Sequence, residues 1–444
     1  MLGNFASSLI SGNTVLPTIY NALTSSSSSI HRGATTIAPI ALLILKCFAI
    51  ALVPYMAVVR KRRFQGINKL LKKYPDQTLP LRDLRVAEEV YTRSFGYDFP
   101  FMMNFAVGLS VLKTSSIPRI TKIQVATRET VDRGPKRAED TNDILGEILD
   151  GPLRREARRF VQDEVDLKTG AVTTRARKST PAAEDIDNDR AEDEARAQAA
   201  IERMNFIHSH YKIQQNDYLY NLSMFATECF YWIEHFDFRP LTDLEKNAIL
   251  GIWTDIARKM GIEYVPATVQ ELVDWTEEYE AEHQVYASTN PMVANSSISL
   301  LQDMFTSPAA KARVKKFFSA IINPRLRKAL GWEEPSQFAV RLCTSLLWIR
   351  GAFVKHLMLP KSVPAVRTAL TATVFEESKG DDPRQSSAAG CPFTGGKRYI
   401  PRFNDLPPVY NLGYRIEELG PSRFFGKGPG AGACPVVGAN LATL

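Results

Sequence analysis

Apolar residues recur at every third or fourth position over most of the chain beyond about residue 70, which is the spacing of one face of an α-helix. The spacing is clear in the run through Tyr220, Phe225 and Trp232, and again over 314–322 and 338–359. We find no segment in which apolar and polar residues alternate as they do in a half-buried strand. The pattern therefore predicts an all-α domain.

Three of these helices have recognisable starts. Thr242–Glu245 has the sequence of a capping box, and Gly261 is suited to end the same helix as its C′ residue. Thr268–Glu271 is a second capping box, at the start of a helix rich in aromatic residues. Asn216 or Asp217 could cap the helix between the charged segment and the first box. Local sequence thus predicts where these helices begin.

An apolar run from Pro39 to Val59 is broken by a single charge, Lys46. It is about 20 residues long, which is enough to cross a hydrocarbon core as a helix. A cleaved signal peptide would carry its cations before the run, and a buried core helix seldom ends in four successive cations, as Arg60–Arg63 do here. We therefore predict a transmembrane helix over 36–60. The positive-inside rule then puts a tail, 1–35, in the lumen and the rest of the chain in the cytoplasm.

The remaining chain is expected to form one helical domain over 61–380 with an irregular tail, 381–444, that is rich in Gly and Pro. Within the domain, about 153–200 is charge-rich and poor in aromatic residues. Such a composition is typical of a solvated insertion or linker.

Charge and cysteine content narrow the function classes. The net charge of +7 equals the seven cations that lie between residues 60 and 73 without any acid. A basic cluster beside an apolar run points to lipid headgroups, so membrane lipids are expected partners and nucleic acid is not. The five cysteines are odd in number and scattered, and they predict neither a disulfide framework nor a zinc site.

One helical stretch carries candidate chemistry. Ile201, Met204, His208 and Tyr211 fall on one face of a helix, so His208 points along an apolar stripe. A buried imidazole in such a place suits an axial ligand of haem iron. A hydrogen-bonded core histidine has the same pattern, and the spacing alone leaves both readings open.

The chain resembles the MpaB family of fungal membrane-bound oxygenases, which are related to the latex-clearing rubber oxygenases. The resemblance rests on blocks that keep the family's order from about residue 95 to 428. They read VLKTSSIPRITKIQVATRET, KRAEDTNDILGEI, ERMNFIHSHY with NDYLYNLSMFA, HFDFRPLTDLEKNAILGIWTDIARKMGI, NPRLRKAL and GYRIEELGPSRFFGKG.

The resemblance implies a globin-like haem domain that holds haem b iron through His208, with Arg203 as a further cofactor-binding candidate. Arg137 and Thr141 match the arginine and threonine of the family's Arg-x-x-Lys-Thr motif, while Asp140 stands at the lysine position. Both are candidate catalytic residues. Arg137 could instead pair with a carboxylate, and Thr141 could cap a helix that starts there.

The activity that the resemblance implies is oxidative cleavage of a carbon–carbon double bond in a prenyl chain. The expected partners are O2 and a hydrophobic, prenylated small molecule of secondary metabolism, and the expected location is the endoplasmic reticulum membrane, with a single span and a cytoplasmic domain. Another O2-dependent step, hydroxylation or desaturation, and a membrane-anchored haem-binding scaffold without turnover remain alternatives.

Overall fold

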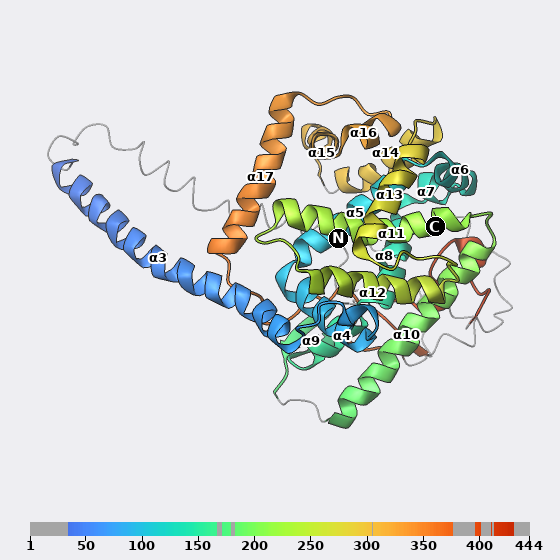
Figure 1. Cartoon of the computed structure of the whole chain (residues 1–444), viewed down its shortest axis with the longest axis horizontal. Helices are drawn as coiled ribbons and strands as arrows, with labels where there is room; N and C mark the ends of the chain where they lie inside the picture. The colour runs from blue at the N-terminus through green and yellow to red at the C-terminus, as the bar shows by residue number, and fades with distance from the viewer. Residues whose placement is uncertain are drawn as a thin grey trace, which may run out of the picture.

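The computed structural model describes residues 34–166, 171–178, 183–303, 305–375, 396–400, 410 and 413–429. Most of them are helical, which confirms the all-α class (Figure 1). The first part of the chain forms α3 (Ala34–Lys73), α4 (Leu84–Tyr91), α5 (Pro100–Thr114), α6 (Pro118–Thr127), α7 (Glu129–Asp132), α8 (Gly134–Leu149) and α9 (Gly151–Arg158). The second part forms α10 (Ala183–Ser209), α11 (Gln215–Phe236), α12 (Asp243–Lys259), α13 (Val269–His283), α14 (Thr289–Gln302), α15 (Pro308–Ile321), α16 (Pro324–Ala329) and α17 (Gln337–His356).

Helices α5 and α11 pack against each other in the core. The Ser110 hydroxyl on α5 donates a hydrogen bond to the Met224 carbonyl on α11 over 3.0 Å, which lets two helix backbones approach closely. Phe105 and Trp232 meet edge to face, with ring centroids 5.2 Å apart. Around this pair, α12 packs on α4, α8 on α10 and α14 on α6.

The predicted helix starts hold in two cases and fail in the third. Thr242 and Glu245 form both hydrogen bonds of the capping box at α12, and Gly261 follows that helix with φ +72°. The Thr268 side chain accepts the Glu271 N–H at the start of α13. By contrast, α11 begins at Gln215 without a side-chain cap, because the Asp217 carboxylate is buried and accepts from Arg119 and Tyr279 instead.

The transmembrane helix predicted over 36–60 falls within α3, which Figure 1 shows extending away from the body of the molecule. Among the described residues, no helix is both long enough and apolar enough to cross a membrane. The side chains of 34–45 and 47–49, and the whole of 1–33, lie outside the described residues.

Two short antiparallel pairs correct the expectation that strands are absent. β1 (Val161–Val165) pairs with β2 (Val172–Ala176), and β3 (Thr373–Phe375) pairs with β4 (Gly396–Arg398). In β1 the half-buried and exposed positions do alternate. The polar composition of this hairpin concealed the pattern, because none of its residues reaches full burial.

The segment expected to be a solvated insertion is packed at both ends. Arg154, Arg158, Asp193 and Arg196 are each exposed by 2% or less. The Arg154 Nε lies 2.6 Å from the Asp193 carboxylate, and an Arg158 nitrogen lies 3.0 Å from it. Arg196 in turn pairs with Glu147 of α8 at 2.7 Å. The composition misled because these charges neutralise one another inside the protein rather than facing water.

The C-terminal segment is likewise not confined to the surface. Much of 381–444 lies outside the described residues, but Tyr414 and Leu419 are fully buried. The Tyr414 hydroxyl donates to the Glu147 carboxylate over 2.7 Å. Part of the described tail, which comprises 396–400, 410 and 413–429, therefore packs into the core of the domain.

Candidate functional site

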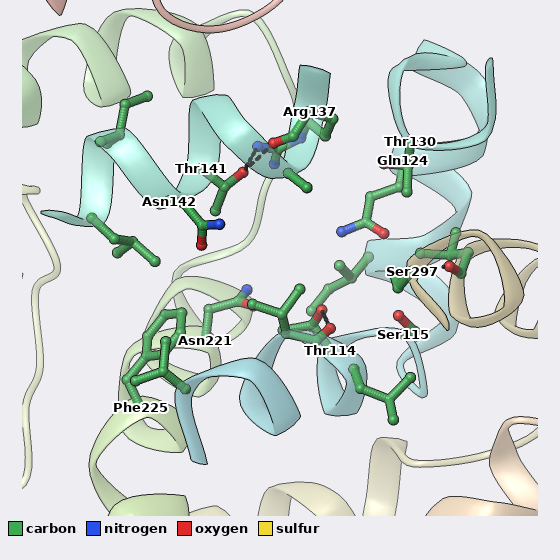
Figure 2. A pocket seen from close by; sticks show the side chains of 18 of the residues that line it. Thr114, Ser115, Gln124, Thr130, Arg137, Thr141, Asn142, Asn221, Phe225 and Ser297 are labelled. Atoms are coloured by element: carbon green, nitrogen blue, oxygen red, sulfur yellow. Dashed lines mark hydrogen bonds between the residues drawn. The ribbon is translucent and has the colours of Figure 1, made fainter. Parts of the chain in front are cut away.

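A cavity of about 400 Å³ lies among α5, α6, α8, the end of α10, α11, α12 and α14. Figure 2 shows part of it: α8 contributes Arg137, Thr141 and Asn142, and α11 contributes Asn221 and Phe225. Most of the wall is apolar, with residues such as Leu109, Leu145, Met204, Leu222, Trp253 and Ile298. The size and the apolar lining are those of a small-molecule site with a few polar groups.

His208, in the last turn of α10, lines this cavity. Its Nδ1 is buried and finds no hydrogen-bond partner, while its ring packs beside Tyr218 with centroids 5.6 Å apart. Burial and, to a smaller extent, the Arg137 cation lower the pKa of His208 to about 4. The imidazole is therefore neutral at physiological pH, which is the form that ligates a metal. His210, two residues on, is exposed, and its Nδ1 contacts the Phe206 carbonyl.

Arg137 and Thr141 lie one helical turn apart on the side of α8 that faces the cavity (Figure 2). The Arg137 guanidinium donates to the Thr141 hydroxyl, and that hydroxyl donates to the Arg137 carbonyl over 2.7 Å. No carboxylate among the described residues pairs with Arg137, and Thr141 sits mid-helix, so neither structural alternative for these two residues holds. Thr141 orients the guanidinium, and its own proton is already used.

Asp140, at the lysine position of the family motif, does not line the cavity. Its carboxylate points to the flank of α8 beside the cavity-facing side, where it accepts from Lys136 at 2.8 Å and from the Tyr410 hydroxyl at 2.6 Å. Lys136 also donates to the Gly420 carbonyl over 2.8 Å. The departure from the motif therefore leaves the cavity without a lysine on this turn and ties α8 to the C-terminal segment.

Arg203 is also placed away from the cavity. Its guanidinium is fully buried and donates to the carbonyls of Leu419, Phe424 and Lys427, at 2.8, 3.1 and 2.5 Å. Through these bonds it fixes the segment that brings Gly420 to the cavity wall. Gly420 has φ +102°, and a Cβ there would lie 2.4 Å from the Ile207 side chain, so only glycine fits.

Several polar residues of the cavity are not apparent from helical spacing. Asn142 and Asn221 come from facing helices, and Ser115, Gln124 and Ser297 lie farther along the wall (Figure 2). The Ser115 hydroxyl and the Gln124 carbonyl oxygen are buried without a hydrogen-bond partner. A signal did exist for four of them, because Ser115, Gln124, Asn142 and Asn221 belong to blocks of the family resemblance.

The residues at hand fit a haem group. A porphyrin requires a single axial ligand from the protein, and His208 presents a neutral ring in an apolar cavity with one nitrogen left unpartnered. Among the described residues, no group of three or more His, Cys, Asp or Glu side chains is arranged to hold a metal ion by itself.

The fold and the cavity define an all-helical protein that can enclose a lipophilic small molecule beside a histidine. Residues 188–351 match the family described as "ER-bound oxygenase mpaB/B'/Rubber oxygenase, catalytic domain". The ER-bound oxygenase mpaB' of Penicillium brevicompactum is 24% identical over 415 residues, which cover 85% of this chain and 88% of that protein. The ER-bound oxygenase mpaB of Penicillium roqueforti is 24% identical over 310 residues, or 65% of this chain and 90% of the relative.

Residues 188–351 are therefore similar to the catalytic domain of this oxygenase family, and the chain is an oxidoreductase of the oxygenase class. The matched range includes His208 but not Arg137 or Thr141, which precede it.

Proposed function

We propose that this protein is a membrane-anchored, haem-dependent oxygenase that cleaves a carbon–carbon double bond in the prenyl chain of a lipid-like small molecule. The observation that carries the proposal is His208, whose neutral ring lines an apolar cavity and whose Nδ1 has no partner. Bound haem b would supply iron that activates O2. His208 would be its proximal ligand.

Arg137 supports an oxygen-activating role for the cavity. It is the only lysine or arginine among the described residues that line it, so a negative charge that develops inside would find its electrostatic partner there. The hydrogen bond from its guanidinium to Thr141 holds that cation in place before the reaction. Preorganised charge of this kind lowers an activation barrier because no reorganisation is needed during the step.

The cavity walls support a prenyl-type substrate. Aliphatic and aromatic side chains from eight helices, including Phe318 of α15, surround the space, and branched hydrocarbon chains bind such walls through apolar contact. Lipid-like substrates concentrate in membranes, and the two relatives are named ER-bound oxygenases. We therefore propose an endoplasmic reticulum location with α3 as the anchor and the helical domain on the cytoplasmic side.

The chemical balance distinguishes this activity from other oxygenase reactions. Cleavage of a carbon–carbon double bond by O2 yields two carbonyl groups that together contain both oxygen atoms, and it requires no net reductant. Hydroxylation places one oxygen atom in the product and reduces the other to water, which consumes two electrons. Product analysis with labelled O2, with and without a reductant, therefore separates the two activities.

The decisive test compares His208→Ala with His210→Ala in the purified full-length protein. His208→Ala should abolish stable haem binding and turnover, since no other histidine of α10 reaches the cavity. His210→Ala should retain both, because that ring lies outside. The measurements are the haem-to-protein ratio, the ferrous–CO spectrum and product formation. A folded His208→Ala protein that keeps its haem and its activity would refute the assignment, and a haem-loaded wild type without turnover would indicate a scaffold.

A further inference from the structure

Exposed large apolar side chains are concentrated on one helix that is remote from the cavity. Phe338, Leu342, Leu346, Ile349 and Phe353 of α17 are between 48% and 75% exposed. At 100° per residue these five positions fall within an arc of roughly 80°. The opposite side of α17, including Leu347 and Val354, is buried against the domain. We call these five residues the α17 stripe.

The α17 stripe continues onto α3. The Arg63 guanidinium donates to the carbonyls of Met358 and Leu359, just beyond α17, at 2.8 and 3.2 Å. The Tyr55 hydroxyl donates to the Leu357 carbonyl over 2.8 Å. Met358 and Leu359 are themselves 43% and 45% exposed. Figure 1 shows the end of α17 lying close to α3, and the two helices are in contact.

The charges carried by α17 itself are of one sign. No Asp or Glu occurs in α17, which carries Arg341, Arg350 and Lys355. Where α3 leaves the domain, Arg60, Lys61 and Arg62 are exposed. None of these three forms an ion pair with a described residue. Arg350 of α17, by contrast, pairs with Asp237 at 3.0 Å. An apolar stripe with the unpaired cations of α3 near one end complements a surface that has an apolar interior and anionic headgroups.

We propose that the α17 stripe inserts into the cytoplasmic face of an anionic lipid bilayer, so that α17 lies in the membrane plane and the domain is held against the bilayer at a second place besides α3. Interfacial helices have this form: an apolar arc facing the acyl chains, with cations at the headgroups. The proposal rests on the proposed anchoring by α3 and the cytoplasmic placement of the domain, but it does not depend on the reaction in the cavity.

Trp348 provides a native probe. It is 62% exposed and lies beside the stripe, while its indole N–H donates to the His235 carbonyl over 3.0 Å and so holds the ring in place. Trp232, Trp253 and Trp332 are buried, and Trp275 is half-buried on α13. The fluorescence that separates wild type from Trp348→Phe therefore belongs to α17.

The test reconstitutes the full-length protein into phosphatidylcholine–phosphatidylserine vesicles, with or without bromine on the acyl chains. Brominated lipid should quench the Trp348 component at least about two-fold, and this quenching should disappear in Trp348→Phe but persist in Trp275→Phe. Replacing phosphatidylserine by phosphatidylcholine should weaken it. The double variant Phe338→Glu/Ile349→Glu should lose most of the quenching, whereas Gln337→Glu, next to the stripe, should keep it.

A Trp348 component that brominated lipid does not quench in membrane-bound protein would overturn the proposal. If the Trp348 fluorescence changes with protein concentration and not with lipid, the proposal is overturned, and a second copy of the chain covers the stripe instead. Failure of the protein to bind the vesicles at all would also overturn the proposal.

Discussion

The two sides of α8 use polar residues in opposite ways. On the side that faces the cavity, Arg137, Thr141 and Asn142 share the space with His208, and several buried polar atoms there have no partner. On the other side, Glu147 is held by Arg196, Arg154 and Tyr414, which form the ion-paired side of the helix. Partners on that side lower the pKa of the Glu147 carboxyl, although burial alone would raise it.

This difference between the two sides of α8 distinguishes polar groups that are available for binding from polar groups that stabilise the fold. Buried polar groups are normally paired, because an unpaired one costs on the order of 1–3 kcal/mol. On the cavity side, the Nδ1 of His208 and the hydroxyl of Ser115 find no partner within the chain. On the ion-paired side, nearly all of the buried polar groups form hydrogen bonds or ion pairs with other groups of the chain, so this side contributes to the stability of the fold.

The largest effect is expected from breaking the ion-paired side at Asp193. Asp193→Ala removes the buried carboxylate that Arg154 and Arg158 share and leaves them only their longer contacts with Glu147 and Asp189, so the free energy of unfolding should fall by about 3–5 kcal/mol. Urea unfolding and soluble yield measure the loss. Glu194→Ala is the matched control, because its pair with Arg190 is exposed and contributes less than about 1 kcal/mol. Equal unfolding midpoints for the two variants would contradict the contrast.

On the cavity side, Arg137→Ala should spare the fold and impair the reaction. Its guanidinium bonds only to Thr141 among the described residues, so little stability is lost, but turnover should fall about 100-fold if the cation stabilises developing negative charge. Steady-state rates at matched haem content check this. Arg133 lies one turn earlier and its side chain is exposed, so Arg133→Ala should keep the wild-type rate. An unchanged rate in Arg137→Ala would remove the residue from the mechanism.

A smaller effect is expected at Asp143, a buried acid of α8 whose pKa is raised, in contrast to that of Glu147. Burial beside Glu139 and Glu147 raises its pKa well above the usual range, so the folded protein keeps a proton that the unfolded chain releases. Its contribution is favourable below about pH 4 and is lost as the pH rises toward the raised pKa. Asp143→Asn should therefore stabilise the protein at pH 8 and leave its stability unchanged at pH 4. A gain that does not vary with pH in chemical unfolding would refute this explanation.

The smallest effect is expected from the exposed hairpin. Joining Gln162 to Arg175, which are register partners, through an Asn-Gly turn removes mostly exposed residues and should change stability by less than about 0.5 kcal/mol. The longer deletion of 168–195, which composition alone would favour, also removes Asp193 and should fail to yield folded protein. If the longer deletion is tolerated as well as the shorter one, the buried pairs are not structural.

Local pattern was sufficient for the features that depend on neighbours in sequence. The capping box at Thr242 and the glycine at position 261 follow from spacing, because helix ends are satisfied by residues within one turn. Helical periodicity also assigned His208 to the apolar face of α10, which is the face that lines the cavity. The family resemblance added Arg137 and Thr141.

What the tertiary structure decided concerns partners that are far apart in the chain. Asp193 lies 39 residues from Arg154, and Arg203 lies 216 residues from the Leu419 carbonyl that it holds. Composition makes such charges look solvated, since the free energy of burying a charge depends on whether a counter-charge arrives from elsewhere in the fold. For the same reason the sequence could not turn Asp140 away from the cavity or bring Asn221 into it, because only packing determines which side of a helix meets another.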